Sequence, residues 1–277
     1  MITRILFISL VLFFSKNVFS QERTVLYKQV DTTRLYMKVL FPEGYQKKSE
    51  KYPAIVFYYG GGWKSGNISQ FLPQATYFSK KGFVCFLVQY RTFSQYKTTP
   101  FESVKDAKSS MRFIKARGND FSIDTARITA SGGSAGGHLA ASLALINGYN
   151  EDSDDLKISP RPAALVLYNP VIDNGPGGYG FERIGEAYHQ FSPLHNIKTG
   201  APPTLFMLGT EDKLIPVVTA QYYKMVMGKV GSKCNLVLYD KAGHGFFNNR
   251  QNEFYAQTLQ EFENFLTSLG YLKNDSK

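Results

Sequence analysis

Cysteine and histidine are scarce in this chain, whose 277 residues include two cysteines and four histidines. No pair of them has the spacing of a metal site, so a zinc centre is not indicated. Cys85 lies inside an apolar run and Cys234 begins another, which favours two packed thiols; a disulfide is the alternative that export would permit. The composition therefore implies no metal and no cofactor.

Acidic residues are also fewer than basic ones, 22 against 32, and the formal net charge is +10. The basic residues are scattered in short pairs such as Lys47-Lys48 and Lys80-Lys81, whereas nucleic-acid-binding proteins concentrate them in a stripe. We therefore expect no nucleic-acid partner. A solvated basic surface is the favoured interpretation, with a weak preference for anionic surfaces or polysaccharides as the alternative.

The sequence lacks an apolar run of the roughly 20 residues that a membrane span needs. The run Ile5–Phe14 follows a single charge, Arg4, and is followed by small residues up to Ser20, which is the order of a secretory signal. We predict a signal peptide over residues 1–20, cleavage before Gln21, export to the periplasm or medium, and no stable membrane anchor. A packed N-terminal helix is the alternative.

From residue 21 to 277, β-rich runs alternate with longer helical patterns, which predicts one catalytic α/β domain with an eight-stranded, mostly parallel sheet and helices on both faces. The expected strands are Thr24–Val30, Leu35–Leu40, Ala54–Tyr59, Phe83–Gln89, Arg127–Ala130, Ala164–Tyr168, Thr204–Leu208 and Asn235–Tyr239, the first two forming an antiparallel hairpin. The expected helices are Phe71–Lys81, Phe101–Ala116, Gly137–Ile146, Thr219–Val230 and Glu253–Leu269.

One long irregular stretch, 169–203, interrupts this alternation, and long loops in compact domains are usually functional or mobile. It is too short for a large helical lid. Its histidines, His189 and His195, are candidates for substrate contact. Its aromatic residues Phe181, Tyr188 and Phe191 offer flat faces of the kind that suit a sugar ring.

The strongest local signal is Gly132-Gly133-Ser134-Ala135-Gly136, where a β-rich run leads into Gly-x-Ser-x-Gly and a helix of small residues follows. This is the pattern of a nucleophile elbow, in which the serine lies on a strained turn and the glycines let backbone and helix approach closely. The strand-turn-helix context predicts that Ser134 is a nucleophile. A glycine-rich turn with a surface serine is the alternative.

A serine hydroxyl needs an adjacent base, and that base needs an acid to fix its tautomer. His244 stands between two glycines after the last expected strand, whereas His138 is only four residues past Ser134 and should point away. Asp212 follows the strand Thr204–Leu208, and Glu211 is the competing carboxylate. The order Ser134, Asp212, His244 predicts a hydrolase triad.

Three glycines after the strand Ala54–Tyr59 predict the remaining element of a hydrolase site, an oxyanion hole. The backbone N–H groups of Gly61 and Gly62, together with that of Ala135, are expected to bind a developing oxyanion, and losing one such donor typically costs about 10²–10³ in rate. A bare glycine turn is the alternative. Trp63, which follows them, is a candidate wall of the substrate pocket, as is Tyr188.

These motifs resemble those of the carboxylesterase/hormone-sensitive-lipase-like branch of the α/β hydrolases, and the similarity covers most of residues 21–277. The matching stretches are Tyr59-Gly60-Gly61-Gly62-Trp63, Gly132 to Gly137, Gly209-Thr210-Glu211-Asp212, Gly243-His244-Gly245-Phe246 and the pair Tyr90-Arg91. The resemblance implies a three-layer α/β-hydrolase fold. The branch usually has His at the position of Tyr59, which puts the geometry of the oxyanion loop and the substrate preference in question.

The chain is also similar to exported bacterial carbohydrate esterases, including acetyl xylan and feruloyl esterases. The expected function is a serine esterase that removes short acyl groups, acetyl above all, from a small-molecule or polysaccharide ester through an acyl-enzyme. The alternatives are a lipid or aryl carboxylesterase, a peptidase-like serine hydrolase and a non-catalytic binding protein on a hydrolase scaffold. Fold alone does not identify the substrate, and nothing in the sequence indicates an oligomeric state.

Overall fold

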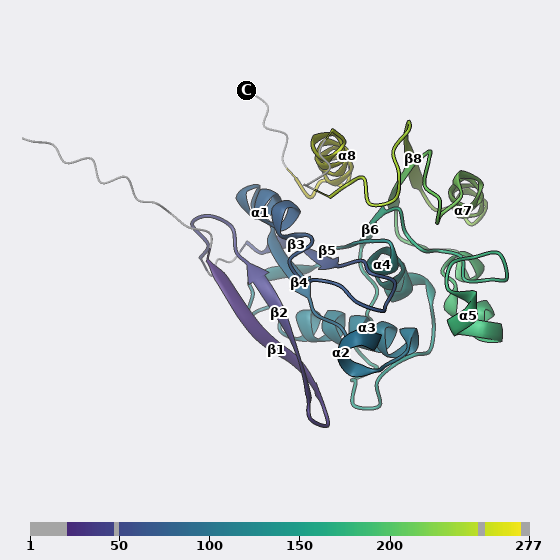
Figure 1. Cartoon of the computed structure of the whole chain (residues 1–277). Helices are drawn as coiled ribbons and strands as arrows, with labels where there is room; N and C mark the ends of the chain where they lie inside the picture. Colours follow the sequence, from purple (N-terminus) through teal and green to yellow (C-terminus); the bar gives the residue numbers. More distant parts are fainter. Residues whose placement is uncertain (1–20, 47–49, 249–252, 273–277) are drawn as a thin grey trace, which may run out of the picture.

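An eight-stranded sheet runs through the computed structural model, which describes residues 21–46, 50–248 and 253–272, and helices cover both of its faces (Figure 1). The predicted signal peptide lies outside the described residues. The strand order is β1-β2-β4-β3-β5-β6-β7-β8. β1 and β2 form the predicted antiparallel hairpin, β2 pairs antiparallel with β4, and every other pairing in this sheet is parallel.

All eight predicted strands are confirmed. They are β1 (Glu22–Val30), β2 (Thr33–Leu40), β3 (Tyr52–Tyr58), β4 (Val84–Val88), β5 (Ile123–Gly133), β6 (Ala164–Tyr168), β7 (Thr204–Gly209) and β8 (Cys234–Tyr239). Only β5 is much longer than predicted. It begins at Ile123 because this residue already pairs with Tyr52 of β3, four residues before the predicted start at Arg127.

The five predicted helices are confirmed with ends within two residues of the expected ones. They are α1 (Leu72–Lys80), α3 (Pro100–Ala116), α4 (Ala135–Leu145), α7 (Val217–Lys229) and α8 (Tyr255–Ser268). The sequence suggested that the stretch 169–203 is irregular, but the structure contains short helices there. It contains α5 (Phe181–Ile184), η1 (Gly185–Ala187), α6 (Tyr188–Phe191) and η2 (Leu194–Asn196), and α2 (Phe93–Tyr96) follows β4. Single turns are too short to show a helical period.

Alternate residues of the central strands supply two hydrophobic clusters, one on each face of the sheet. On β3, Val56 packs into the cluster that also contains α3 and α4, whereas Ile55 and Phe57 pack into the cluster that contains α1 and α8. This division follows from the two-residue period of a strand. Because β3, β5, β6 and β7 pair in parallel, their carboxyl ends meet at one edge of the sheet, which is covered on both faces.

Cys85 and Cys234 are both free thiols, in β4 and β8. Five strand steps separate these strands in the sheet order, which at about 4.8 Å a step far exceeds the roughly 7 Å over which a disulfide can join two Cα atoms. Among the described residues, no helix is both long enough and apolar enough to cross a membrane.

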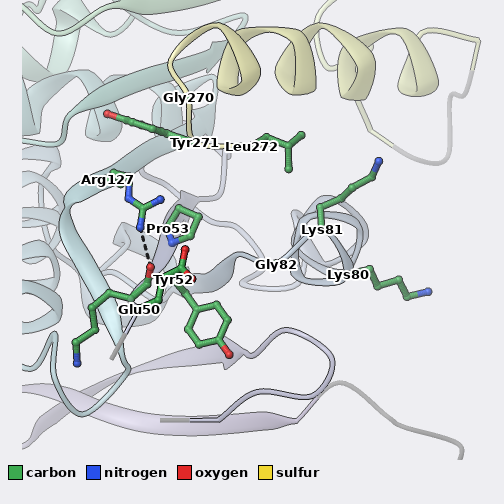
Figure 2. Close-up of a pocket in the computed structure, with 11 residues that line it drawn as sticks. Glu50, Tyr52, Pro53, Lys80, Lys81, Gly82, Arg127, Gly270, Tyr271 and Leu272 are labelled. Atoms are coloured by element: carbon green, nitrogen blue, oxygen red, sulfur yellow. Dashed lines mark hydrogen bonds between the residues drawn. The ribbon is translucent and has the colours of Figure 1, made fainter. Parts of the chain in front are cut away.

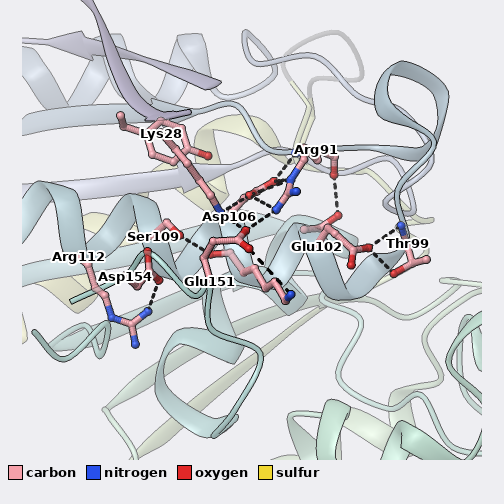
Figure 3. A network of polar contacts seen from close by, with 12 residues as sticks. Lys28, Arg91, Thr99, Glu102, Asp106, Ser109, Arg112, Glu151 and Asp154 are labelled. Carbon is pink, nitrogen blue, oxygen red and sulfur yellow. Dashed lines mark hydrogen bonds and ion pairs between the residues drawn. The ribbon is translucent and has the colours of Figure 1, made fainter. Parts of the chain in front are cut away.

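A buried ion cluster joins the hairpin to the helical layer (Figure 3). The fully buried carboxylate of Asp106, on α3, accepts hydrogen bonds from Lys28 Nζ at 2.6 Å and from Arg91 Nη2 at 2.8 Å. Glu151 also contacts both cations at 2.8 Å. Burial opposes the charge on Arg91, but the hydrogen bonds and charges of Asp106 and Glu151 outweigh it and raise the pKa of Arg91.

The Asp106→Ala substitution is expected to lower the free energy of unfolding by about 3–5 kcal/mol, because it removes the fully buried carboxylate and leaves two buried cations with Glu151 alone. The matched control is Glu22→Ala, which removes the exposed Lys38–Glu22 pair at 3.0 Å and is expected to cost at most about 1 kcal/mol. Urea unfolding of the full chain measures both. Equal losses in the two variants would contradict the importance of the buried cluster.

Candidate active site

Ser134 forms the entire turn between β5, which ends at Gly133, and α4, which begins at Ala135. Its backbone is strained, with φ +54° and ψ −121°, a conformation that a non-glycine residue rarely adopts. The neighbouring glycines are required sterically: a Cβ on Gly132 would lie 2.3 Å from the carbonyl oxygen of Gly136, and a Cβ on Gly136 would lie 2.1 Å from that of Tyr58. The serine hydroxyl is thus presented at the carboxyl end of β5.

His244 lies between the predicted nucleophile and the predicted acid. Its Nε2 is 3.0 Å from Ser134 Oγ, and its Nδ1 is 2.8 Å from Asp212 Oδ2. The Asp212 side chain is fully buried, and its other oxygen accepts the backbone N–H groups of Leu214 and Ile215 at 2.8 and 3.0 Å. Glu211 is exposed. The structure therefore brings Ser134, His244 and Asp212 together and places the competing carboxylate outside the group.

The glycine loop after β3 leaves a defined set of backbone donors free. The carbonyl oxygen of Gly61 accepts the N–H groups of Lys64 and Ser65 at 3.0 and 3.1 Å, which turns the N–H of Gly62 the opposite way, because the two groups belong to one planar trans peptide. The N–H of Gly60 is taken by Gln70 Oε1 at 2.6 Å. For Gly61 and Gly62, no acceptor occurs within the described residues.

Ala135 supplies the third expected donor, as the first residue of α4, where a helix has N–H groups without helical acceptors. Gly60 lies directly beside the elbow, since a Cβ on it would be 3.4 Å from Ser134 Cβ. An alcohol nucleophile, an imidazole held by a buried carboxylate and an adjacent loop with free N–H groups form an arrangement suited to acyl transfer.

Tyr59, which stands where the resembling enzymes have His, is held by a reciprocal contact with Tyr90. The two rings stack at 4.2 Å with an interplanar angle of 17°. Tyr59 Oη donates to the carbonyl oxygen of Tyr90 at 3.1 Å, and Tyr90 Oη donates to that of Tyr59 at 2.7 Å. Burial raises the pKa of both phenols, so both remain donors at neutral pH. This pair supports the glycine loop in place of a histidine.

Arg183 is a second support that sequence reasoning missed. It lies on α5, and its Nη1 donates to the carbonyl oxygen of Gly62 at 2.5 Å. Its guanidinium also lies over the rings of Trp63 and Tyr179, at 5.2 and 5.5 Å from their centroids. Nothing in the local sequence distinguishes this arginine from a surface residue. It ties the stretch 169–203 to the glycine loop.

The expectation that Trp63 offers its ring to a substrate is not met, because its side chain is only 1% exposed. Its ring packs edge-on against His138 at 5.1 Å and Phe191 at 6.2 Å, and Arg183 covers it. Phe191 is likewise fully buried. These two aromatic side chains anchor the stretch 169–203 to the domain, and a substrate does not reach them in this conformation.

The other histidines lie away from the triad. Burial lowers the pKa of His138 to about 3, so this residue is a neutral core histidine, and its Nε2 contacts the carbonyl oxygen of Phe191 at 3.0 Å. His189 and His195 pack against the ring of Tyr188, at centroid distances of 3.9 and 5.2 Å. Both histidines are exposed and Tyr188 is half-buried, so substrate contact by these three residues stays a prediction.

Asn169 is a further neighbour of the site that no motif indicated. It follows β6, is fully buried, and places its Nδ2 3.3 Å from His244 Nε2. The only signal that could have found it is topological. β6 lies next to β5 and β7 in the sheet, so the residue after β6 emerges beside the turns that carry Ser134 and Asp212.

A separate cavity of about 580 Å³ lies at the opposite edge of the sheet (Figure 2). It is lined by Tyr52 at the start of β3, by Gly82 just before β4, and by Arg127, which donates to the carbonyl oxygen of Lys51 at 2.7 Å. Ligand sites of open α/β sheets lie at the carboxyl ends of the strands. We therefore place the candidate active site at Ser134 rather than at this cavity.

Comparisons with known proteins find hydrolase and esterase relatives. Residues 39–174 match the family model BD-FAE, and residues 177–269 match the Dienelactone hydrolase family. The structure of Thermogutta terrifontis esterase 2 phosphoramylated by tabun superimposes with a TM-score of 0.88 at 35% identity, over 92% of this chain and 97% of that one. The same esterase with propionate bound gives 0.86 at 34% identity, over 92% and 96%.

Curated relatives include an acetylxylan esterase of Xylanibacter ruminicola, 27% identical over 80% of this chain and 47% of the relative. Another is a probable isoprenylcysteine alpha-carbonyl methylesterase of Oryza sativa subsp. japonica, 26% identical over 84% of this chain and 59% of the relative. The chain thus spans about half the length of the curated relatives that it matches.

The two neighbouring carboxylates are expected to differ sharply in effect. Asp212→Asn should lower kcat for p-nitrophenyl acetate by about 10⁴, because an amide in that place favours the wrong imidazole tautomer. Glu211→Gln, the matched control, changes an exposed side chain and should leave kcat within about twofold of wild type. Steady-state kinetics of the two purified variants make the comparison. A larger loss at Glu211 would show that the acid was assigned to the wrong residue.

Proposed function

The chain belongs to the carboxylesterase-like α/β hydrolases, and on this premise we propose that it hydrolyses carboxylic esters through an acyl-enzyme on Ser134. The observation that carries the proposal is the placement of His244 within hydrogen-bonding distance of both Ser134 Oγ and Asp212 Oδ2. Such a bridge lets an imidazole take the serine proton while a buried carboxylate stabilises the resulting imidazolium.

The reaction follows from these contacts. Ser134 Oγ attacks the ester carbonyl carbon, and its proton passes to His244 Nε2. The carbonyl oxygen becomes an oxyanion, for which the N–H groups of Gly61, Gly62 and Ala135 are the free donors. Collapse of this intermediate breaks the bond to the alcohol, which leaves with the proton from His244. A water molecule gives a proton to His244 and attacks the acyl-enzyme; the bond to Ser134 Oγ then breaks, the proton passes from His244 to this oxygen, and the acid is released.

We propose that the acyl group is short, acetyl above all, and that the alcohol is a sugar of a polysaccharide. A cavity of about 530 Å³ adjoins Gly60, and four polar side chains, those of Asn67, Ser69, Gln70 and Asn248, line it beside Leu72 and Pro73. Each buried CH₂ of an acyl chain is worth about 0.8 kcal/mol only where an apolar groove receives it. The similarity to an acetylxylan esterase is further support.

A second candidate is an ester with a larger apolar acyl or aryl group. Leu214 and Val218 follow Asp212 closely in the chain and are 45% and 67% exposed. Exposed apolar side chains beside a catalytic acid would favour an apolar substrate. This candidate is the alternative outcome of the experiment that follows.

The test is a series of p-nitrophenyl esters from acetate to palmitate, combined with acetate release from acetylated xylan. We expect kcat/KM to be highest for the acetate and at least about tenfold lower for the palmitate, since the polar side chains in the cavity beside Gly60 gain nothing from added CH₂ groups. Ser134→Ala is the control and should lower kcat by about 10⁴ or more on every substrate. A maximum at eight carbons or beyond, with no acetate released from the glycan, would favour the second candidate.

We also propose that the enzyme is exported, as expected from Arg4, the apolar run Ile5–Phe14 and the small residues up to Ser20. Cleavage before Gln21 would remove two basic residues, Arg4 and Lys16, and lower the formal net charge from +10 to +8. Intact-mass measurement on the protein from its native host is expected to find a species that begins at Gln21. A mature species that retains residues 1–20 would refute this proposal.

A further inference from the structure

Three amide side chains outside the triad form a line of hydrogen bonds from the glycine loop toward His244; we call Gln70, Asn248 and Asn169 the amide relay. Gln70 Oε1 accepts the N–H of Gly60 at 2.6 Å, and Gln70 Nε2 donates to Asn248 Oδ1 at 3.2 Å. Asn248 Nδ2 then donates to the carbonyl oxygen of Gly245 at 2.8 Å. One half of the relay thus joins the two loops that flank Ser134.

The other half of the relay reaches the imidazole itself. The N–H of Gly245 donates to Asn169 Oδ1 at 3.1 Å, and Asn169 Nδ2 lies 3.3 Å from His244 Nε2. An amide presents an acceptor on one side and donors on the other. Because the Gly245 N–H requires the oxygen, the NH₂ group of Asn169 must face His244. The orientation of this amide is therefore determined by the backbone of the loop that it supports.

Asn169 is itself held rigidly. Its side chain is fully buried, its backbone N–H donates to the carbonyl oxygen of Met207 in β7 at 2.7 Å, and its φ is +33°. Asparagine tolerates a positive φ better than most residues. The end of the relay nearest His244 is therefore fixed between two strands of the central sheet.

Neither connected loop carries an anchoring side chain on the glycines at its centre. Gly60, Gly61 and Gly62 carry none, and His244 stands between Gly243 and Gly245, the latter at φ +82°. Glycine has the largest backbone freedom to lose on folding. Contacts from outside must therefore hold each loop, and a misplacement of about 1 Å at a reacting group can lower the rate 10²-fold.

We propose that Gln70, Asn248 and Asn169 are positioning residues that hold the oxyanion loop and the His244 imidazole in one geometry. This inference rests on the proposed serine-hydrolase chemistry and states how the groups of that site are held in position. The alternative role for Gln70 and Asn248 is substrate binding, because both also line the cavity of about 530 Å³ beside Gly60. A positioning residue acts on kcat, whereas a residue that only binds substrate acts on KM.

The test uses the full chain with p-nitrophenyl acetate as substrate and a fluorophosphonate as the label for Ser134. Gln70→Leu and Asn248→Ala should each lower kcat by about 10–100-fold and leave KM within about threefold. The double variant should lose little more than the worse single variant, because both substitutions break the same line of contacts. The rate of fluorophosphonate labelling should fall in parallel with kcat.

Gln74→Leu is the matched control. Gln74 lies on α1, and its Nε2 donates to the carbonyl oxygen of Phe247 at 3.3 Å. This bond reaches the same loop as the Gln70 contact but stays outside the relay. The substitution should change the melting temperature and leave kcat within about twofold of wild type, since no catalytic group depends on that bond.

Asn169→Asp tests the other half of the relay. The carboxylate keeps an acceptor for the N–H of Gly245 and suits the same backbone conformation. It removes the donor that faces His244 Nε2 and puts an oxygen there, which would hold the imidazolium and slow the return of its proton. We expect kcat to fall at least about tenfold, with KM little changed.

Several outcomes would overturn the relay. The first is a kcat within twofold of wild type in folded Gln70→Leu and Asn248→Ala, whether KM stays the same or rises. The second is a double variant in which the two losses of kcat multiply. The third is a loss of kcat in Gln74→Leu equal to that in the relay variants. Failure to release acetate from xylan refutes the glycan substrate alone, because p-nitrophenyl acetate still reports on the relay. A wild-type enzyme that neither hydrolyses this ester nor takes the label refutes the serine-hydrolase chemistry and the relay with it.

Discussion

The carboxylate of Asp106 is completely buried and is neutralised by cations from two distant parts of the chain, Lys28 of β1 and Arg91 after β4. It also accepts the backbone N–H of Arg91 at 2.8 Å, which fixes the path of the chain where it leaves β4. The residue before Arg91 is Tyr90, whose ring and hydroxyl hold Tyr59. The buried ion cluster thus holds the residue next to Tyr90, and Tyr90 in turn holds Tyr59 at the start of the glycine loop.

The site itself is built from segments that cannot hold their own shape. Glycines let the elbow turn, free the N–H groups of Gly61 and Gly62, and flank the base. Side chains from other segments hold these glycines by hydrogen bonds to their backbone: Gln70 holds Gly60, Arg183 holds Gly62, and Asn169 holds Gly245. Such external supports allow an active site to combine strained or glycine-rich backbone with a single geometry.

The stretch 169–203 provides part of the support for the active-site loops but covers little of the site. It contains one-turn helices and places Phe191 inward, fully buried against Trp63 of the glycine loop, which Arg183 of the same stretch covers. Because these two side chains are packed inward, they offer no surface to a long acyl chain. The physical basis of the proposed preference for short acyl groups is therefore the same packing that buries Trp63.

The sequence by itself determined the features that depend on short stretches of chain. Strand and helix periods predicted the sheet and its helices, and the Gly-x-Ser-x-Gly turn predicted the elbow at Ser134, because its geometry is set by residues that are adjacent in the chain. Asp212 and His244 were also predictable, since parallel strands bring the turns at their carboxyl ends to one edge of the sheet. The positive φ of Ser134 follows from the same local constraints.

Only the tertiary structure decided what covers and supports these residues. From its position after the glycine loop, Trp63 was predicted to line the substrate pocket, but packing against His138 and Arg183 buries it. Asn169 meets His244 across 75 positions of the sequence, and Gln70 meets Asn248 across 178. No local pattern marks such pairs, because they arise where separately folded segments come to lie side by side, and that placement depends on the packing of the whole sheet.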